Sequence, residues 1–545
     1  MSSLYILGGD SSEENVKAKY YYIIGSGSIL NPGEVVNDAL ELNSIAKNYA
    51  QEFSDYIFSL NKILFENQTF LKKISLYHLS DLSCKRTELF DTYSTFCNVF
   101  FLKKFITDNN IDIVYFDCCN YSLQKSLTNF FPSIDFKVIS EKKTIKKFKS
   151  PLVKNIIFFS KVLISRVIED FIFLNNKNNK NNKNNKNFFL TRFPSHLSKN
   201  YKEDKFSNLL NSSDRYLINL HTDGFHQSIS VYNYIKFQYS IKRLGNGVIL
   251  DNFIGYRDIF KCLFYSYKIC QSFRPLYDKD FIFKGVNLTK LIHDELSLSK
   301  IRIPRLLLIG GAFRSFCKQF RPVKFYYYLH EYSYGKVFTY VGNVFFPKMK
   351  LYAFQHGPSS SRKLVYFSGK GELNKRANGI SSFYLPDKLF SEDTFSLGLY
   401  NNAGYVNVTL MNKIYRLSYL GNISINQKKD FFLIVPGLND GKILIKSLIN
   451  VINTNSTKKY IIKPHPRAED NYLERYKDII NLYISYASIE SLLPASKKIY
   501  TSYSSVGIEA KILGIDVELV EIPGKVNESP LIDADFVSCL QDIRY

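Results

Sequence analysis

The amino-acid sequence predicts an α/β protein built from three units of parallel sheet with flanking helices. Short apolar runs rich in β-branched and aromatic residues alternate with helical segments along most of the 545 residues, and this alternation is typical of parallel sheets. Residues 175–187, a run of Asn with Lys at every third position, have nothing to bury and predict a solvated linker. We therefore expect an N-terminal accessory α/β domain over 1–174, and two facing Rossmann-like lobes over 188–424 and 425–545.

The first unit is predicted from strands and helices that alternate upstream of the linker. We expect strands at 4–7, 20–24 and 111–116, and helices at 34–53 and 95–107. Glycines follow the first two strands, at Gly8-Gly9-Asp10 and Gly25-Ser26-Gly27, but neither segment continues as GxGxxG. Tight turns are therefore favoured over a dinucleotide site.

Residues 151–174 carry apolar side chains at helical spacing, interrupted by charges such as Lys161 and Glu169. The segment is too charged to cross a bilayer. We expect a helix docked on the protein, with an interfacial or partner-binding helix as the alternative.

Downstream of the linker the alternation starts again. In the middle unit we expect strands at 188–194, 215–220, 248–251, 324–329 and 350–354, and a helix at 258–272. In the C-terminal unit we expect strands at 431–437, 460–462, 482–484, 498–500 and 517–520, and helices at 440–452, around 472–477, through 493 and at 506–513. In such open sheets, ligands bind outside the carboxyl ends of the strands.

Composition excludes several classes of protein. The chain has 45% hydrophobic and 16% aromatic residues, which is a globular composition. Its net charge of +23 attracts anions such as a nucleotide or an acidic membrane face. No helix-turn-helix, zinc-finger or RNP-like pattern occurs, so we expect no nucleic-acid partner. The eight cysteines lack CxxC spacing, which favours buried free thiols in a reducing cytosol. With no signal-peptide pattern and no long uncharged apolar run, we expect a cytoplasmic protein.

Two segments of the C-terminal unit carry the chemistry of a candidate site. Residues 463–467, Lys-Pro-His-Pro-Arg, follow one apolar strand, and residues 501–510, which include Ser504 and Ser505, follow another. The Lys and Arg bring positive charge, and the serines stand where a helix begins, so hydroxyls and backbone N–H groups can hold an anion. His465 can donate a proton near neutral pH. The pair predicts a phosphate site, and a turn at His-Pro with a helix cap at Ser-Ser is the structural alternative.

The two motifs resemble the His-Pro and Ser-Ser motifs of bacterial GT-B glycosyltransferases that use CMP-activated sugars, namely the sialyl, polysialyl and Kdo transferases. Similar motifs occur in the glycerophosphate polymerases of teichoic acid synthesis. The resemblance implies a GT-B core in which His465 contacts the CMP phosphate and acts as an acid toward it, while Ser504 and Ser505 bind the same phosphate. The further residues that we assign to the donor phosphate or nucleotide are Lys463, Pro466, Arg467, Gly437 and Glu509.

The middle unit supplies candidates for the base that takes the proton of the acceptor hydroxyl. Glu331 follows one predicted strand and His356 follows the next, so each stands at a carboxyl edge. With residues 191–196 and 221–226, these segments resemble the middle region of bacterial surface carbohydrate biosynthesis proteins. The His-Gly step at 356 also resembles the glycerophosphate polymerases, whose histidine there acts as base. Glu331 and His356 are the leading candidates, and Asp223 is the third.

The sequence therefore predicts a glycosyltransferase that needs neither metal nor cofactor. The resemblance implies that it moves a nonulosonic acid or Kdo from a CMP-linked donor to a bacterial surface glycan such as capsule, O-antigen or lipooligosaccharide. Asp-x-Asp occurs at 278–280 and 533–535, but neither follows the kind of strand that a metal-binding GT-A site uses. The first alternative is a glycerophosphotransferase that uses CDP-glycerol or a related CDP-alcohol, and the second is a non-catalytic capsule assembly scaffold. Peripheral contact with the anionic inner membrane face is a further expectation.

Overall fold

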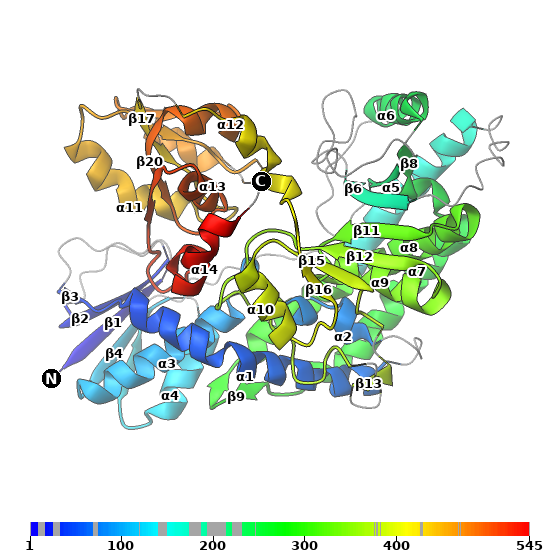
Figure 1. The fold of residues 1–545 in the computed structure, drawn as a ribbon. Coiled ribbons are helices and arrows are strands. Elements are labelled where there is room, and N and C mark those ends of the chain that lie inside the picture. Colours follow the sequence, from blue (N-terminus) through cyan, green and yellow to red (C-terminus); the bar gives the residue numbers. More distant parts are fainter. Residues whose placement is uncertain are drawn as a thin grey trace.

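The structure is a computed structural model that confirms the predicted α/β class. It describes residues 2–8, 17–25, 33–68, 75–118, 120–139, 150–173, 187–192, 214–220, 231–245, 247–374, 376–377, 380–381, 383–425, 429–466, 468 and 470–543. Three parallel sheets, one in each predicted unit, form the framework (Figure 1). The predicted linker lies outside the described residues except for Asn187, which opens a strand.

The N-terminal sheet has the strand order β3-β2-β1-β4-β5, and every neighbouring pair is parallel. Its strands are β1 (Ser3–Gly8), β2 (Tyr20–Ile24), β3 (Glu34–Val35), β4 (Ile113–Asp117) and β5 (Asp135–Val138). Its main helices are α1 (Ala39–Glu66), α3 (Thr92–Asp108) and α4 (Tyr121–Phe130). The helix predicted at 34–53 begins later and runs further, because the Asp38 side chain caps α1 by accepting from the Glu41 N–H at 3.0 Å.

The middle sheet has seven strands in the order β16-β15-β12-β11-β6-β7-β8. They are β6 (Asn187–Arg192), β7 (Arg215–Asn219), β8 (Gly247–Ile249), β11 (Lys324–Tyr328), β12 (Lys350–Phe354), β15 (Lys388–Ser391) and β16 (Val408–Leu410). The helices of this unit are α6 (Val231–Leu244), α7 (Tyr256–Phe273), α8 (Thr289–Phe320), α9 (Ser333–Phe345) and α10 (Thr394–Asn402).

The C-terminal sheet has the order β19-β18-β17-β20-β21. Its strands are β17 (Phe431–Ile434), β18 (Tyr460–Ile462), β19 (Leu482–Ile484), β20 (Ser496–Thr501) and β21 (Asp516–Leu519). Its helices are α11 (Gly441–Thr454), α12 (Ile489–Leu492), α13 (Val506–Ile512) and α14 (Ala534–Cys539), and the helix predicted around 472–477 is a short 3₁₀ turn. Two separate hydrophobic clusters fill this unit.

The 32-residue helix α8 joins the N-terminal and middle units. It packs on α7 and α9 of the middle unit and on α2 (Leu76–Leu79) and α4 of the N-terminal unit. One continuous hydrophobic cluster therefore runs through both units. Buried polar pairs cross the same junction, including an ion pair between Asp81 and Arg302. The predicted helix over 151–174 is α5 (Pro151–Phe173), and it docks on α7 and α8.

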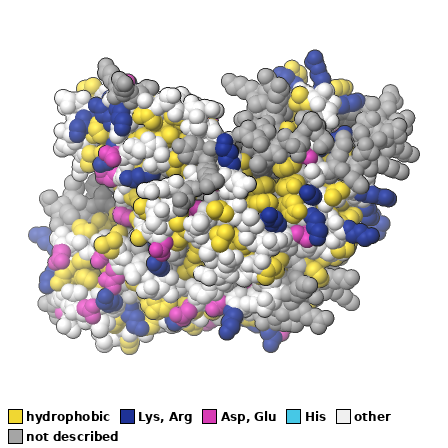
Figure 2. Space-filling model, in the orientation of Figure 1, with side chains coloured by type: hydrophobic (Ala, Val, Ile, Leu, Met, Phe, Trp, Pro, Cys, Tyr) yellow, Lys and Arg dark blue, Asp and Glu magenta, His cyan; other side chains and the backbone are white. Residues whose placement is uncertain are grey.

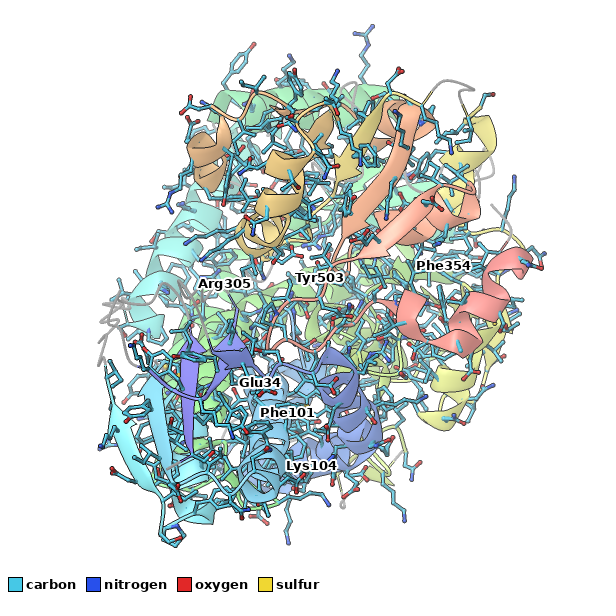
Figure 3. All side chains as sticks on the ribbon, turned by 90° about the vertical axis from the view of Figure 1, so that its left-hand side faces the viewer. Glu34, Phe101, Lys104, Arg305, Phe354 and Tyr503 are labelled. Atoms are coloured by element: carbon cyan, nitrogen blue, oxygen red, sulfur yellow. The ribbon has the colours of Figure 1, made fainter. Side chains whose placement is uncertain are left out.

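The chain that follows β21 touches all three units. The Gly25 N–H donates to the Pro523 carbonyl at 2.8 Å, and the Asn98 side chain donates to the Gly524 carbonyl at 2.9 Å. On the other side, the Arg362 side chain donates to the Asn527 carbonyl at 2.7 Å. This segment therefore holds the C-terminal unit against both others. In Figure 3, Tyr503 lies at the junction of the C-terminal unit with the N-terminal unit that carries Glu34 and Phe101.

The described helices include none that is both long and apolar enough to cross a membrane. The described cysteines are free thiols, and most of them are buried, as the sequence predicts.

Candidate functional site

The two C-terminal motifs lie at the same sheet edge. Strand β17 pairs with β18 on one side, with Ile434 opposite Ile462, and with β20 on the other, with Ile434 opposite Tyr500. Because all three strands are parallel, the loops that follow them leave the sheet at one edge. The loops that begin at Pro436, Lys463 and Ser502 are therefore neighbours, although they lie far apart in sequence.

The His-Pro loop continues β18 and then turns tightly. The Lys463 N–H donates to the Ile434 carbonyl at 2.9 Å, and the Ala468 N–H donates to the His465 carbonyl at 3.0 Å. Pro464 is buried, Pro466 is exposed, and Lys463 and His465 are half-buried. Partial burial lowers the pKa of the Lys463 ammonium. Arg467 lies outside the described residues, so its predicted role stays a prediction.

The Ser-Ser loop leads from β20 into α13. The Ser504 N–H donates to the Thr501 hydroxyl at 3.2 Å, and the Ser504 hydroxyl accepts from the Val506 N–H at 3.4 Å. The Ser505 hydroxyl lies 3.5 Å from a carboxylate oxygen of Glu509. Both serines are half-buried. Ser504 thus contacts the first turn of α13, whereas the side chain of Ser505, the N-cap residue, makes no cap hydrogen bond.

Gly437 brings the loop after β17 against the loop after β20. A Cβ atom at this position would lie 2.7 Å from the ring of Tyr503, a distance that real Cβ contacts do not reach. A side chain at this position would displace the Tyr503 ring. Gly437 therefore lets the two loops approach each other, and its predicted contact with the donor stays a prediction.

A cavity of about 290 Å³ adjoins these loops, between the C-terminal and N-terminal units. It is lined from the C-terminal unit by Asn439, Asp440, Ser502, Tyr503 and residues 520–528, and from the N-terminal unit by residues in 87–94. Four carboxyl groups and one ammonium, that of Lys525, line it. The four are Glu88, Asp91, Asp440 and Glu528.

Asp440 is a cavity carboxylate with a buried oxygen that is still able to accept a hydrogen bond. Its side chain is 4% exposed, and one oxygen accepts from the Ser502 hydroxyl. The other oxygen, Oδ1, is buried and accepts no hydrogen bond from the described part of the chain. Burial raises the pKa of Asp440 and raises that of Glu528 to about 7. Buried carboxylates of this kind favour a ligand that donates hydrogen bonds.

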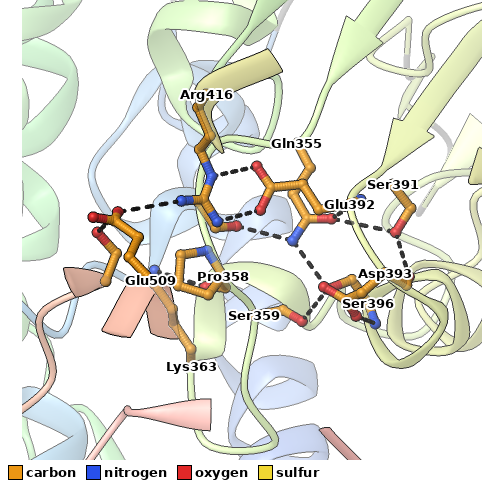
Figure 4. Close-up of polar contacts among 12 residues, drawn as sticks. Gln355, Pro358, Ser359, Lys363, Ser391, Glu392, Asp393, Ser396, Arg416 and Glu509 are labelled. Carbon is orange, nitrogen blue, oxygen red and sulfur yellow. Dashed lines mark hydrogen bonds and ion pairs between the residues drawn. The ribbon is translucent and has the colours of Figure 1, made fainter. Parts of the chain in front are cut away.

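The turn after β12 of the middle unit is connected to α13 of the C-terminal unit through Glu392 and Arg416. The amide of Gln355 holds the turn: it donates to the Gly357 carbonyl at 2.9 Å and accepts from the Glu392 N–H at 2.8 Å (Figure 4). Gly357 has φ of +90°, a conformation that favours glycine. His356, between them, is half-buried, and its ring centroid lies 5.2 Å from that of Tyr328.

Arg416 connects the middle and C-terminal units. Its guanidinium binds the Glu392 carboxylate through two hydrogen bonds of 2.6 and 2.5 Å and lies 4.0 Å from the Glu509 carboxylate on α13 (Figure 4). The two carboxylates raise the pKa of Arg416 against the opposing effect of burial. Glu509 also accepts from the Tyr419 hydroxyl. Its carboxylate therefore holds the two units together, and its predicted contact with the nucleotide stays a prediction.

Glu331 lies in a closed environment. Its side chain is 4% exposed and accepts from the Tyr400 hydroxyl, and its other oxygen lies 3.5 Å from Nδ1 of His330. The turn that positions it includes Leu329, which has φ of +60°. His330 is equally buried, and burial lowers its pKa. Asp223, the third candidate base, lies outside the described residues.

Three residues of this region escaped the sequence analysis. They are Asp440, Glu392 and Arg416. Asp440 begins a predicted helix next to Gly437, which is a local signal for a site at a strand end. Glu392 follows β15, a strand that was not predicted, and Arg416 lies in a 3₁₀ segment without any motif. Among the described residues, no three His, Cys, Asp or Glu side chains lie close enough together to hold a metal ion.

No family model matches the chain, and a search of curated proteins gives no match. Among solved structures, the chain resembles UDP-GlcNAc 2-epimerase from Neisseria meningitidis bound to UDP-GlcNAc, with 11% identity, a TM-score of 0.36, and coverage of 63% of this chain and 84% of that one. It also resembles the wall teichoic acid polymerase TagF (12% identity, TM-score 0.30, 73% and 90% coverage) and MurG from Acinetobacter baumannii (9%, 0.33, 65% and 82%). These TM-scores are too low to support a conclusion about function.

Proposed function

We propose that the protein is a GT-B glycosyltransferase that moves a sugar from a CMP-activated donor to a bacterial surface glycan. The sugar is a nonulosonic acid or Kdo, as the resemblance of the motifs implies. The observation that carries the proposal is the convergence of the His-Pro and Ser-Ser loops at one edge of the C-terminal sheet, facing the middle unit. A phosphate bound there would lie between the units, where an acceptor can reach the sugar.

In this proposal, the edge residues hold and protonate the leaving phosphate. Lys463 supplies positive charge, and the hydroxyls of Ser504 and Ser505 donate to phosphate oxygens. His465, in its protonated form, donates a proton to the phosphate as the glycosidic bond to the sugar breaks. This proton transfer matters most in the transition state, when negative charge develops on the leaving group.

The adjoining cavity is suited to the nucleoside. Its carboxyl groups repel phosphate but accept hydrogen bonds from ribose hydroxyls and from the amino group of cytosine. Asp440 has the oxygen that such a donor would use. We therefore predict that the neutral nucleoside binds in the cavity beside Tyr503, and that the anionic phosphate binds at Lys463 and the serines.

The acceptor must lose a proton to a base, and the geometry favours His356 for this role. His356 is half-buried on a turn held by Gln355, and a neutral imidazole can accept a proton near pH 7. Glu331 remains a candidate from sequence, but its carboxylate is enclosed and bonded to Tyr400. Asp223 is kept as the third candidate.

The first alternative, a glycerophosphotransferase that uses CDP-glycerol or a related CDP-alcohol, would use the same phosphate site. The second alternative, a non-catalytic scaffold, predicts no binding of cytidine nucleotides.

In the proposal, the enzyme works in the cytoplasm, at the inner face of the membrane.

A thermal-shift screen with CMP, CDP, UDP and GDP tests the proposal, because a ligand that binds the native state raises the unfolding temperature. We expect stabilisation by cytidine nucleotides and weaker effects from UDP and GDP. Parallel incubations with a CMP-sugar and with CDP-glycerol then compare consumption of each donor. Consumption of CDP-glycerol alone would move the assignment to the first alternative. A protein that no cytidine nucleotide stabilises would contradict the proposal.

A further inference from the structure

Helices α5 and α7 share an outer face that is rich in exposed apolar side chains. On α7, Phe260 is 60% exposed, Phe264 54% and Tyr267 49%. These positions are three and four residues apart, so they form one stripe along the helix. On α5, Ile164 is 56% exposed and Phe171 is 74% exposed. The set that we call the outer face is Ile156, Ile157, Ile164, Val167, Phe171, Tyr256, Phe260, Phe264 and Tyr267.

The two stripes belong to one surface because both helices dock on α8 and on each other. The buried sides of the helices, with Phe159 on α5 and Ile269 on α7, are part of the core. At one end the Tyr256 hydroxyl of α7 donates to the Asp170 carboxylate of α5 at 2.7 Å. The opposite sides of the two adjacent helices therefore point outward together. In Figure 1, α7 and α8 lie at the right-hand edge of the molecule.

The charges on this surface are predominantly basic. Helices α5 and α7 together carry six Lys or Arg and three Asp or Glu. The two acidic residues of α5, Glu169 and Asp170, are both paired with Arg166. Lys268 lies over the ring of Phe264 at 5.6 Å, and Lys261 is exposed beside Phe260. Figure 2 shows Lys and Arg side chains gathered at this edge of the molecule.

We propose that the outer face of α5 and α7 docks the protein on a bilayer that contains anionic phospholipid. Aromatic and aliphatic side chains on one side of a helix, with Lys and Arg beside them, match the interfacial zone of a membrane, where apolar groups enter the acyl boundary and cations meet lipid phosphates. The basic charge selects a lipid surface over a second copy of this face, which would carry the same charge. Docking is independent of the transfer reaction and requires no donor.

Vesicle co-sedimentation of the full chain tests the inference. We compare vesicles of phosphatidylcholine alone with vesicles of phosphatidylcholine mixed with phosphatidylglycerol. We expect binding to the mixed vesicles that weakens at high salt, because salt screens the attraction between lysines and lipid phosphates. Phe260→Ser/Phe264→Ser should weaken binding about tenfold or more, because two apolar side chains no longer enter the bilayer. Lys261→Glu/Lys268→Glu should remove the preference for phosphatidylglycerol.

Ile480→Ser/Tyr486→Ser provides the matched control, because these residues are 92% and 69% exposed on the C-terminal unit. This variant should bind vesicles as the wild type does, and thermal melts should show that all variants are folded. Absence of vesicle binding by the wild type would overturn the inference. It would also be overturned if the control variant lost as much vesicle binding as Phe260→Ser/Phe264→Ser. Sedimentation velocity that shows a wild-type dimer and a Phe260→Ser/Phe264→Ser monomer would assign the face to a second copy instead. Donor binding should be the same in every variant, so a failure here leaves the proposed function untouched.

Discussion

The carboxyl edges of the C-terminal and middle sheets differ in the burial and pairing of their ionisable groups. At the C-terminal edge, Lys463, His465 and the two serines are half-buried. At the middle edge, Glu331 is enclosed and bonded to Tyr400, and Glu392 is bound by Arg416. The same position in a parallel sheet therefore leaves ionisable groups half-buried in one unit and engages them mostly in structural pairing in the other.

This difference shows why a polar residue at a strand end is not by itself a catalytic candidate. Burying a carboxylate is costly unless its oxygens are paired, and a paired carboxylate is held away from substrate. Both oxygens of Glu392 are paired with Arg416. One oxygen of Glu331 accepts from Tyr400, and the other, Oε2, accepts no hydrogen bond from the described residues. His356 is the exception at the middle edge, because its turn is held by Gln355 while the imidazole itself stays half-buried.

Replacing Arg416 should have the largest effect on stability. Arg416→Leu leaves the Glu392 carboxylate, which is 1% exposed, without its bidentate partner. Removing one partner of a buried pair costs about 3–5 kcal/mol of unfolding free energy. Denaturant unfolding measures the loss, and Arg416→Leu/Glu392→Leu should recover most of it. A loss below about 1 kcal/mol, the value of an exposed pair, would show that the buried pair of Arg416 and Glu392 contributes little to stability.

Replacing His465 should have the largest effect on turnover. General acid catalysis typically contributes ~10²- to 10⁴-fold, so His465→Ala should reduce kcat by this range while CMP affinity stays near the wild-type value. Single-turnover kinetics and calorimetry measure the two quantities. Retention of more than about a tenth of wild-type turnover would remove His465 from the role of acid.

Replacing both serines should weaken the binding of CMP. Ser504→Ala/Ser505→Ala removes two donors to a charged phosphate, each worth about 1.5–3 kcal/mol, so CMP affinity should fall at least tenfold. A melt of the free protein is the control, because Ser504 also contacts the first turn of α13. Unchanged CMP affinity in a folded variant would exclude the serines from the phosphate site.

Measuring both kcat and stability in each variant distinguishes the two candidate bases. His356→Ala should reduce kcat with little change in unfolding temperature, and the acidic limb of the wild-type pH profile should lie in the imidazole range. Glu331→Gln keeps an oxygen that accepts from Tyr400, so we expect a stability change of about 1 kcal/mol and nearly unchanged kcat. The reverse pattern would restore Glu331 as the base. Near-normal kcat in both variants would direct the search to Asp223.

The sequence predicted the strands that carry the two motifs well because their signals are local: each motif directly follows an apolar strand. The strand predictions at β2, β12, β18 and β19 match the structure residue by residue. Helix α8 was not predicted, because Pro304, Gly310 and Gly311 disfavour a helix locally. Packing from both sides overrides that preference, and the buried pair of Arg302 with Asp81 adds a contact that no local pattern encodes.

The same limit applies to contacts between units. Arg416 meets Glu392 and Glu509 only after the units are placed, and the cavity beside Tyr503 needs residues from both ends of the chain. The accessory role predicted for residues 1–174 rested on the linker and on the two lobes expected downstream of it. The structure adds a shared core through α8 and a shared cavity wall at 87–94.

The location of a bound nucleotide tests the central claim most directly. A crystal structure of the full chain with CMP should show the phosphate within hydrogen-bonding distance of Ser504, Ser505 and Lys463, with the nucleoside in the cavity that Asp440 lines. A phosphate bound instead at the glycine turns that follow β1 and β2, or a nucleotide held by the middle unit alone, would contradict the assignment of the C-terminal edge as the donor site.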